Sequence, residues 1–216
     1  LFGTADSAGR RTTRGDFGAL RFAGRSERAR HGADGVDEVA RHIGRLAGLD
    51  LGNLALTVVL EEINRGCAST GVTLSVHNSL LSSPILHFGS QEQHARYFPR
   101  LASGEALGAY AITEPDHGSD AAAIETTCRR EGDEWVLNGT KAWITNGSYA
   151  DIIVTFATMD PSLRSRGISA FVIEKSMPGF SVGKKEKKLG IRGSDTVQLI
   201  FDEMRVPAQN LLGEEG

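Results

Sequence analysis

The sequence predicts an α+β fold in which an N-terminal α-helical domain is followed by a small β-barrel or β-sandwich domain. Apolar residues recur at helical spacing up to about residue 104, and after residue 108 they alternate along short segments separated by turns. The composition is ordinary for a globular protein, since 40% of the 216 residues are hydrophobic and 24% are charged. The change of period places the boundary between the two domains near residues 104 to 108.

The first 35 residues are rich in Gly, Arg, Ser and Ala and contain few large apolar side chains. Such a segment has little to bury, so we expect a poorly ordered or aberrant N-terminus at residues 1–35. Arginine and serine are also common in organelle transit peptides, but Asp6, Asp16 and Glu27 fit that interpretation poorly. No amphipathic period is visible there either, so targeting is the less favoured hypothesis.

Residues 36–105 are predicted to form the helical domain. Apolar residues lie three and four positions apart along residues 36–47 and again along residues 56–66. A third helix is predicted from Ser69, where Ser and Thr can cap free amides, to Pro84. Ser90 and Gln93 form a capping-box signature, which opens a fourth helix that stops near Gly104.

Residues 106–208 are predicted to form the β domain. Short runs of alternating or apolar residues follow one another there, and turn residues separate them. Gly132-Asp133 and Asn138-Gly139 are predicted to be hairpin turns, because these residues tolerate positive φ. The predicted strands are residues 109–113, 126–131, 134–138, 140–145, 151–158, 168–174, 180–185 and 196–201.

Charge, hydropathy and cysteine usage exclude several classes of function. The net charge of −3 gives no basic footprint for nucleic acid, and no apolar run is long enough for a bilayer-spanning helix. We therefore expect neither nucleic-acid binding nor membrane insertion. Cys67 and Cys128 have no metal-type spacing, so we expect no metal site and two buried free thiols, with a disulfide disfavoured.

Two features carry possible chemistry. The loop at residues 113–120 contains Gly and Ser at positions where backbone amides and a hydroxyl could approach phosphate oxygens. Trp143 and Thr145 follow on a predicted strand, where alternation places them on one side, and together they could cover a flat cofactor and donate a hydrogen bond to it. Each has a simpler interpretation, because acidic turns between strands are common and a lone Trp on a strand is often plain core.

The order of these features resembles the acyl-CoA dehydrogenase family. The similarity covers roughly residues 47 to 216. The flavin-binding signature of that family is similar to residues 109–115, 118–120 and 135–146, and further matches lie at residues 188–196, 201–203 and 206–207. Residues 61–71, 77–79 and 88–90 resemble the short-chain, butyryl-CoA dehydrogenase-like branch more narrowly.

The resemblance implies that FAD is the cofactor and assigns residues to it. Tyr110, Ile112 and Thr113 match a strand that lies along the flavin, with Thr113 bonding its pyrimidine end. Gly118 and Ser119 match the loop that reaches the flavin diphosphate, and Ser119 is also expected near the pantetheine arm of the substrate.

A second segment of the implied flavin site lies on the predicted strand at residues 140–145. Trp143 and Thr145 match the pair that covers the flavin and bonds its N5 and O4 side, and Ile144 contributes backbone between them. A fixed donor at that edge stabilises the electron density that accumulates there on reduction.

The sequence departs from the family pattern in three places. Asp116-His117 stands where small residues are common, and we expect His117 to be a solvent-facing loop residue rather than a general base. The expected N-terminal helices are not recognisable before about residue 47. The chain stops at Gly216, where relatives begin a C-terminal helical domain, so residues 209–216 are expected to be the start of a truncated domain.

The family's catalytic glutamate lies in that C-terminal domain. No residue of this chain is therefore expected to be catalytic, and none of Glu61, Glu62 or Glu114 inherits the role. For the full-length enzyme the resemblance implies FAD-dependent α,β-dehydrogenation of a short-chain acyl-CoA, a reaction of fatty acid β-oxidation and lipid metabolism. A glutamate removes the α-proton and the β-hydrogen leaves as hydride to flavin N5. We expect the fragment alone to be inactive.

The resemblance also implies partners and leaves alternatives open. Electron-transferring flavoprotein is the expected electron acceptor, the full-length enzyme is expected to be a homotetramer, and bacterial cytoplasm and mitochondrial matrix are both compatible locations. An acyl-CoA oxidase-like flavoenzyme and a noncatalytic flavin- or CoA-binding module are the alternatives. Acyl-chain length is not fixed by the sequence.

Overall fold

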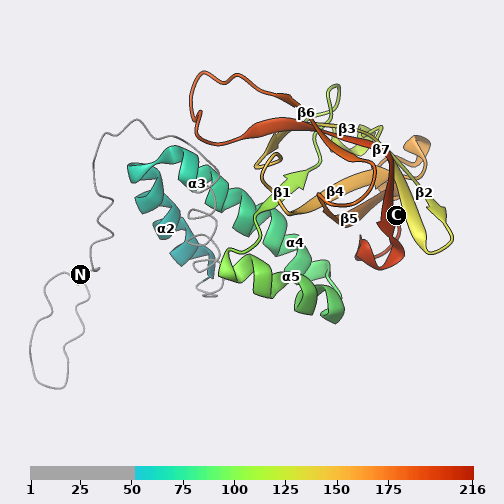
Figure 1. Ribbon diagram of the computed structural model, residues 1–216, viewed down its shortest axis with the longest axis horizontal. Coiled ribbons are helices and arrows are strands. Elements are labelled where there is room, and N and C mark those ends of the chain that lie inside the picture. The colour runs from blue at the N-terminus through green and yellow to red at the C-terminus, as the bar shows by residue number, and fades with distance from the viewer. Residues whose placement is uncertain (1–51) are drawn as a thin grey trace, which may run out of the picture. The chain divides into compact units, whose positions relative to one another are not determined.

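The computed structural model describes residues 52–216, with side chains from Leu54 onward. The helix predicted at residues 36–47 and the segment 1–35 lie outside the described residues. Helices come first along the described chain and strands follow (Figure 1). This order confirms the predicted α+β fold with N-terminal helices before a β-rich part.

The first helices are longer and more continuous than predicted. α2 (Gly52–Gly66) confirms the helix at residues 56–66, and α3 (Ala68–Ser75), a π-helical segment η1 (Val76–Ser82) and α4 (Ser83–Phe88) follow directly. The predicted cap at Ser69 is wrong, because Cys67 is the N-cap residue and its side chain makes no capping hydrogen bond. The predicted stop at Pro84 is also wrong. Pro84 lies at the first turn of α4, where its missing N–H costs least, and the π-helical turn accommodates it.

α5 (Gln91–Ser103) begins and ends as the sequence predicts. The Ser90 hydroxyl accepts from the backbone N–H of Gln93 at 3.2 Å, and the Gln93 side chain accepts from the N–H of Ser90 at 3.0 Å. Gly104 ends the helix in the left-handed conformation, with φ of 74°. The reciprocal cap is worth about 1 kcal/mol by the usual measure of such caps.

The strands form one sheet, which does not close into a barrel in the described part of the chain. Their order is β6-β7-β3-β2-β4-β5-β8, and β1 pairs in parallel with β4. The bounds are β1 (Gly108–Ala111), β2 (Thr127–Glu131), β3 (Glu134–Thr145), β4 (Ile152–Thr158), β5 (Ile168–Glu174), β6 (Phe180–Lys185), β7 (Thr196–Pro207) and β8 (Leu211–Leu212). β7 is longer than predicted, and β8 lies within residues 209–216, where no α-helix begins.

Asn138 and Gly139 do not form a hairpin turn. β3 runs through both residues, and the register of β3 with β7 shifts between Leu137 and Gly139. The Asn138 side chain is held across the sheet, because its Nδ2 donates to Glu203 at 2.7 Å and its Oδ1 accepts from the N–H of Glu203 at 2.8 Å. A Cβ on Gly139 would collide with the Cα of Thr126, so glycine is needed there for close approach rather than for a turn. The Gly132-Asp133 hairpin between β2 and β3 is confirmed.

Two hydrophobic clusters lie on the sheet. The first contains residues of β1, β3, β4, β5 and β7, with Trp135 packed edge-on against Phe171 at 5.4 Å between ring centroids. The second joins helices to the sheet, since Leu81, Ile85 and Leu101 pack with strand residues of β4 and β5. The helices are therefore fixed to the sheet by shared core, and β1 begins directly beside η1.

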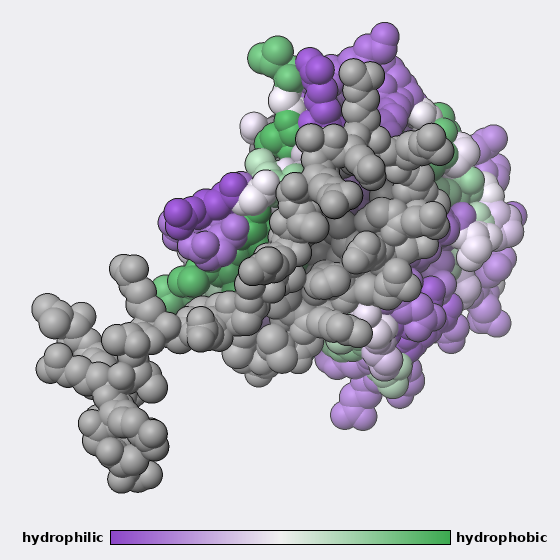
Figure 2. Space-filling view, turned by 60° about the vertical axis from the view of Figure 1, so that its left-hand side comes forward, coloured by the Kyte–Doolittle hydropathy of each residue, from purple (hydrophilic) through white to green (hydrophobic). Residues whose placement is uncertain are grey.

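Hydrophobic residues also remain on the surface. In the face drawn in Figure 2, hydrophilic residues dominate the right-hand edge and hydrophobic residues are interspersed among them. Cys128 is buried and Cys67 is exposed at the junction of α2 and α3, so the prediction of two buried thiols holds for Cys128 alone; both are free. Within residues 52–216, no helix combines the length and apolar character needed to cross a membrane.

Candidate cofactor-binding site

The two segments predicted to form the site lie side by side. The backbone N–H of Ala142 on β3 donates to the carbonyl of Thr113, just beyond the end of β1, at 2.8 Å. Thr113 is consequently next to Trp143, although the two are 30 positions apart in the sequence. The structure brings these predicted residues together through backbone pairing.

Trp143 is not a core residue. It is 60% exposed, and its backbone has φ of 61°, which is uncommon for a bulky side chain. The register of β3 with β7 shifts between Lys141 and Ile144, so Trp143 lies in a β-bulge that breaks the simple alternation. A strained backbone costs about 1–3 kcal/mol and persists where the surroundings impose it, most often at functional sites. The indole is an aromatic plane held in solvent by the sheet.

The residues that flank Trp143 have different environments. Ile144 is 2% exposed and its side chain belongs to the core of the sheet, so only its backbone could serve the predicted contact with the flavin. Thr145 is half-buried at the end of β3. The turn that follows is fixed by Asp195, which accepts from the N–H of Ser148 at 2.9 Å, and by Asn146, whose amide donates to the carbonyl of Gly108 at 3.0 Å.

Tyr110 lies on the side of β1 opposite the main core of the sheet. Ala109 and Ala111 belong to that core, whereas Tyr110 packs beside Phe156 at 5.3 Å between ring centroids, next to the helix-facing cluster. Tyr110 is half-buried, and burial raises the pKa of its hydroxyl. Ile112, two residues further along, is also half-buried.

Gly118 and Ser119 are exposed on the loop between β1 and β2. A Cβ on Gly118 would meet no atom within 4 Å, and its φ is not in the left-handed region, so the folded chain does not itself require glycine there. Within the described residues the Ser119 hydroxyl makes no hydrogen bond, and no hydrogen bond joins Ser119 to the Trp143 segment. The loop offers an open position and an unengaged hydroxyl.

A buried ion pair beneath this loop was not anticipated from the sequence. Lys141 is fully buried and its Nζ lies 2.7 Å from Oε1 of Glu114, which is 4% exposed. Burial by itself raises the pKa of Glu114, but hydrogen bonds from Lys141, Thr126 and Glu125 outweigh it and lower that pKa below its ordinary value. Burial lowers the pKa of Lys141, and the hydrogen bond and charge of Glu114 oppose that shift. Lys141 is a charged residue at a buried position of β3. A lysine within a largely apolar strand was the sequence signal that could have indicated a buried ion pair.

His117 is only partly exposed, not the fully solvent-facing loop residue that the sequence predicts. Its side chain is 23% exposed, and Nε2 lies 3.5 Å from a carboxylate oxygen of Glu125. The loop folds back so that the N–H of Glu114 donates to the carbonyl of His117 at 2.9 Å.

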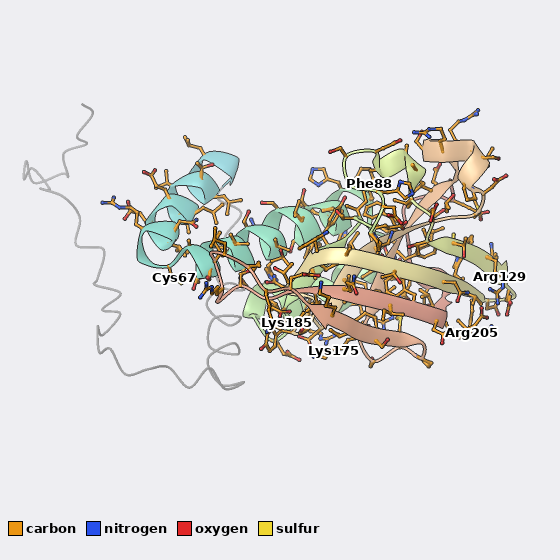
Figure 3. The ribbon with its side chains drawn as sticks, turned by 90° about the horizontal axis from the view of Figure 1, so that it is seen from above. Cys67, Phe88, Arg129, Lys175, Lys185 and Arg205 are labelled. Carbon is orange, nitrogen blue, oxygen red and sulfur yellow. The ribbon has the colours of Figure 1, made fainter. Side chains whose placement is uncertain are left out.

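Two further ion pairs adjoin the candidate site, since Arg164 lies 2.8 Å from Asp120, beside Ser119, and Lys185 lies 3.0 Å from Asp195, which fixes the turn after Thr145. A separate charged cluster lies away from it. Arg129 and Arg205 project together at the end of the sheet farthest from Cys67, where both bond Glu131 (Figure 3). This cluster is exposed and surface-paired, and such pairs add little stability. Within residues 52–216, no three His, Cys, Asp or Glu side chains are grouped to hold a metal ion.

Family models match most of the chain. Residues 41–105 match the acyl-CoA dehydrogenase N-terminal domain, and residues 109–204 match the acyl-CoA dehydrogenase middle domain. A mitochondrial short-chain specific acyl-CoA dehydrogenase of Rattus norvegicus is 54% identical over 171 residues, which are 79% of this chain and 42% of that protein. An acyl-CoA dehydrogenase of Bacillus subtilis is 50% identical over 187 residues, 87% of this chain and 48% of that protein. The chain thus spans less than half the length of these relatives.

Solved structures show the same fold. Butyryl-CoA dehydrogenase from Megasphaera elsdenii has a TM-score of 0.80 at 39% identity, and the match covers 86% of this chain and 51% of that one. An acyl-CoA dehydrogenase from Bacillus anthracis complexed with FAD has a TM-score of 0.77 at 38% identity, covering 86% and 34%. A prolyl acyl carrier protein oxidase has a TM-score of 0.77 at 35% identity, covering 85% and 51%.

Proposed function

The chain belongs to the acyl-CoA dehydrogenase family, and we propose that it is the flavin-binding part of an enzyme that dehydrogenates a short-chain acyl-CoA thioester at its α and β carbons. The short-chain assignment is supported by the short-chain specific relative of Rattus norvegicus, which is 54% identical to this chain over the matched region. FAD is the proposed cofactor.

The observation that carries the proposal is the exposed, strained Trp143 held beside Thr113. An indole that is 60% exposed at φ of 61° is unfavourable for the chain alone, whereas a flat aromatic cofactor would cover it. Gly118 and the unengaged Ser119 hydroxyl give the same indication, since neither is needed by the chain itself. The residues present therefore fit a flavin with a phosphate-bearing tail.

Each proposed site residue has a role that its environment permits. Trp143 covers the ring and limits its access to water, and the half-buried Thr145 hydroxyl donates to the N5 and O4 edge. Thr113 and the backbone of Ile144 bond the polar atoms of the ring, while Tyr110 and Ile112 line the strand beside it.

The remaining contacts lie on the loop. The open position at Gly118 lets backbone amides approach the diphosphate, and Ser119 bonds the diphosphate or the pantetheine arm of the substrate. Bound FAD supplies the hydride acceptor for the oxidation. The proposal assigns the catalytic base to a glutamate outside these 216 residues, so Glu114 serves structure rather than proton transfer.

FAD binding by the 216-residue chain tests the cofactor assignment. After removal of any bound flavin, equilibrium dialysis should show saturable binding of FAD and no comparable binding of NAD, which lacks the isoalloxazine ring. Equal or undetectable binding of both nucleotides would contradict the assignment.

Turnover tests where the catalytic base lies. With butyryl-CoA and a dye as electron acceptor, the 216-residue chain should show no measurable dye reduction, because it holds the electron sink but no base for the α-proton. Butyryl-CoA-dependent dye reduction by this chain would overturn the assignment of the base.

An oxidase is the second candidate, and the structural match to a prolyl acyl carrier protein oxidase favours keeping it. An oxidase passes electrons to oxygen, whereas a dehydrogenase passes them to a partner flavoprotein. Reoxidation of the reduced whole protein that contains this chain should be slow in air and fast with electron-transferring flavoprotein. Fast reoxidation by oxygen alone would assign the oxidase.

The wider assignments also belong to this proposal. Electron-transferring flavoprotein is the proposed electron acceptor, the whole enzyme is proposed to be a homotetramer, and the bacterial and mitochondrial relatives support cytoplasm or mitochondrial matrix as its location. The proposed division of the chain is residues 1–35, 36–105, 106–208 and 209–216.

A further inference from the structure

The ion pair of Lys141 with Glu114 has no role in the chemistry described above. Both side chains are almost completely removed from solvent, at 0% and 4% exposed, and Nζ lies 2.7 Å from Oε1. Taking two charges out of water is expensive, and a buried pair is weak evidence for net stability. The pair is therefore better explained by the segments of the chain that it joins than by a gain in stability.

Glu114 closes the loop between β1 and β2. Its Oε2 accepts from the backbone N–H of Glu125 at 2.6 Å, and its Oε1 accepts from the N–H of Thr126 at 3.0 Å. The carboxylate therefore joins the first residues of the loop to the last ones, immediately before β2. Gly118 and Ser119 lie between the two ends, so the carboxylate sets the span of the segment that carries them.

Lys141 connects the closed loop to β3. Its Nζ donates both to Glu114 and to the carbonyl of Ile112, at 3.3 Å, while the next residue, Ala142, donates its N–H to Thr113. The bulge that contains Trp143 begins directly after Lys141. One ammonium group thus fixes the beginning of the loop to the strand that carries the exposed indole.

We propose that Lys141 and Glu114 are positioning residues that hold the loop of residues 113–126 at a fixed place relative to Trp143, so that both sides of the flavin site are formed before the cofactor binds. The inference rests on the proposed function. It assigns the pair to preorganisation of the site rather than to stability of the fold.

Two single substitutions remove one charge each. Glu114→Gln retains the shape of the side chain, and Lys141→Met retains the apolar stem, but each leaves its partner as an uncompensated buried charge. We expect both to increase amide hydrogen exchange in the segment 113–126 of the FAD-free chain and to weaken FAD binding about tenfold or more, as a loss of about 1.4 kcal/mol would do.

The double substitution Lys141→Met with Glu114→Gln separates positioning from folding. Removing both charges leaves no lone buried ion, so the free energy of unfolding should return toward the wild-type value. The loop still lacks its tie through Lys141 to β3, so FAD affinity should stay about tenfold weaker. If the double variant bound FAD as tightly as the wild-type chain, the pair would serve stability alone and the proposal would be overturned.

Glu174→Gln is the matched control. Glu174 is 17% exposed and bonds Arg96 and Arg100 of α5, so its substitution weakens helix–sheet packing away from the loop. FAD affinity and exchange in segment 113–126 should stay at wild-type values. A loss of FAD affinity equal to that of Glu114→Gln would show that affinity merely follows stability, and would refute the positioning role.

Hydrogen exchange and FAD binding together distinguish a failure of this proposal from a failure of the proposed function. If the wild-type chain bound no FAD, the flavin assignment would be wrong, and the proposal that the pair positions a flavin site would be wrong with it. If the wild-type chain bound FAD but Glu114→Gln left amide hydrogen exchange in the segment 113–126 unchanged, only the proposal that Glu114 holds the loop closed would be wrong.

Discussion

Acidification should destabilise this fold through one buried imidazole, that of His77 in the π-helical segment η1. His77 is 0% exposed, and its Nδ1 accepts a hydrogen bond from the backbone N–H of Gly108, at the first residue of β1, at 3.1 Å. Protonation of Nδ1 removes this acceptor and places a charge in the core. Burial lowers the pKa of His77 from 6.5 to about 4, a shift that the backbone of Leu101 partly opposes.

The sign of the effect follows from the lowered pKa. Above pH 6.5 the imidazole is neutral in both folded and unfolded chains, so its protonation costs nothing. As pH falls from 6.5 to about 4, the unfolded chain binds a proton that the folded chain does not, and stability is lost across that window. Each pKa unit is worth about 1.4 kcal/mol, so the full loss is about 3 kcal/mol, a large part of a typical unfolding free energy.

Urea unfolding at pH values from 4 to 7 measures this loss, with His77→Gln as the test variant and His87→Gln as the control. His87 is exposed on α4, so its substitution should leave the pH profile unchanged. The wild-type unfolding free energy should fall by about 3 kcal/mol more than that of His77→Gln across the window. Parallel pH profiles for the wild type and His77→Gln would refute the reasoning.

Two further substitutions test packing and strain. Gly108→Ala should destabilise the chain by at least 1 kcal/mol, because the new Cβ would collide with the side chain of Leu81. In a double-mutant cycle followed by urea unfolding, Leu81→Ala should recover part of that loss. Strictly additive losses of unfolding free energy would show that the two residues are not in contact. Trp143→Gly should have an unfolding free energy about 1 kcal/mol higher than Trp143→Ala, because glycine adopts positive φ without strain, and both should weaken FAD binding; equal stability of the two variants on calorimetry would indicate that the backbone at Trp143 is not strained.

Local patterns predicted those parts of the fold that local interactions determine. The helical period of residues 56–66, the capping box at Ser90 and the Gly132-Asp133 hairpin each involve residues within a few positions of one another, and all three are present. The sequence also predicted that helices precede a β-rich part, because a change of period is visible along the chain.

Features that depend on distant residues were missed. Asn138-Gly139 has the composition of a turn, but pairing with Glu203 and close approach to Thr126 extend the strand through it. The π-helical turn before Pro84 depends on continuing a helix that proline alone would be expected to end. Glu203 and Thr126 are distant from Asn138-Gly139 in sequence, and the helix continues past Pro84 against local preference, so local propensity predicted the wrong structure at both places.

The sequence named candidate site residues but did not give their arrangement. The motif resemblance identified Thr113 and Trp143, whereas their adjacency comes from the backbone bond to Ala142. The strained φ of Trp143 follows from a register shift against β7, and the pairing of Glu114 with Lys141 crosses 27 positions of sequence. Only the folded chain shows that these residues form one framework.

The indole N–H signals of the two tryptophans offer the most direct test of a flavin resting on Trp143. The chain contains Trp135, which is 1% exposed in the core, and Trp143, which is 60% exposed, and Trp143→Phe assigns their two signals in a nitrogen–proton correlation spectrum. Titration with FAD should shift the Trp143 signal and leave that of Trp135 in place, while ADP, which lacks the isoalloxazine ring, should not shift the Trp143 signal. A Trp143 signal unchanged when FAD is saturating, or moved equally by ADP, would contradict the account.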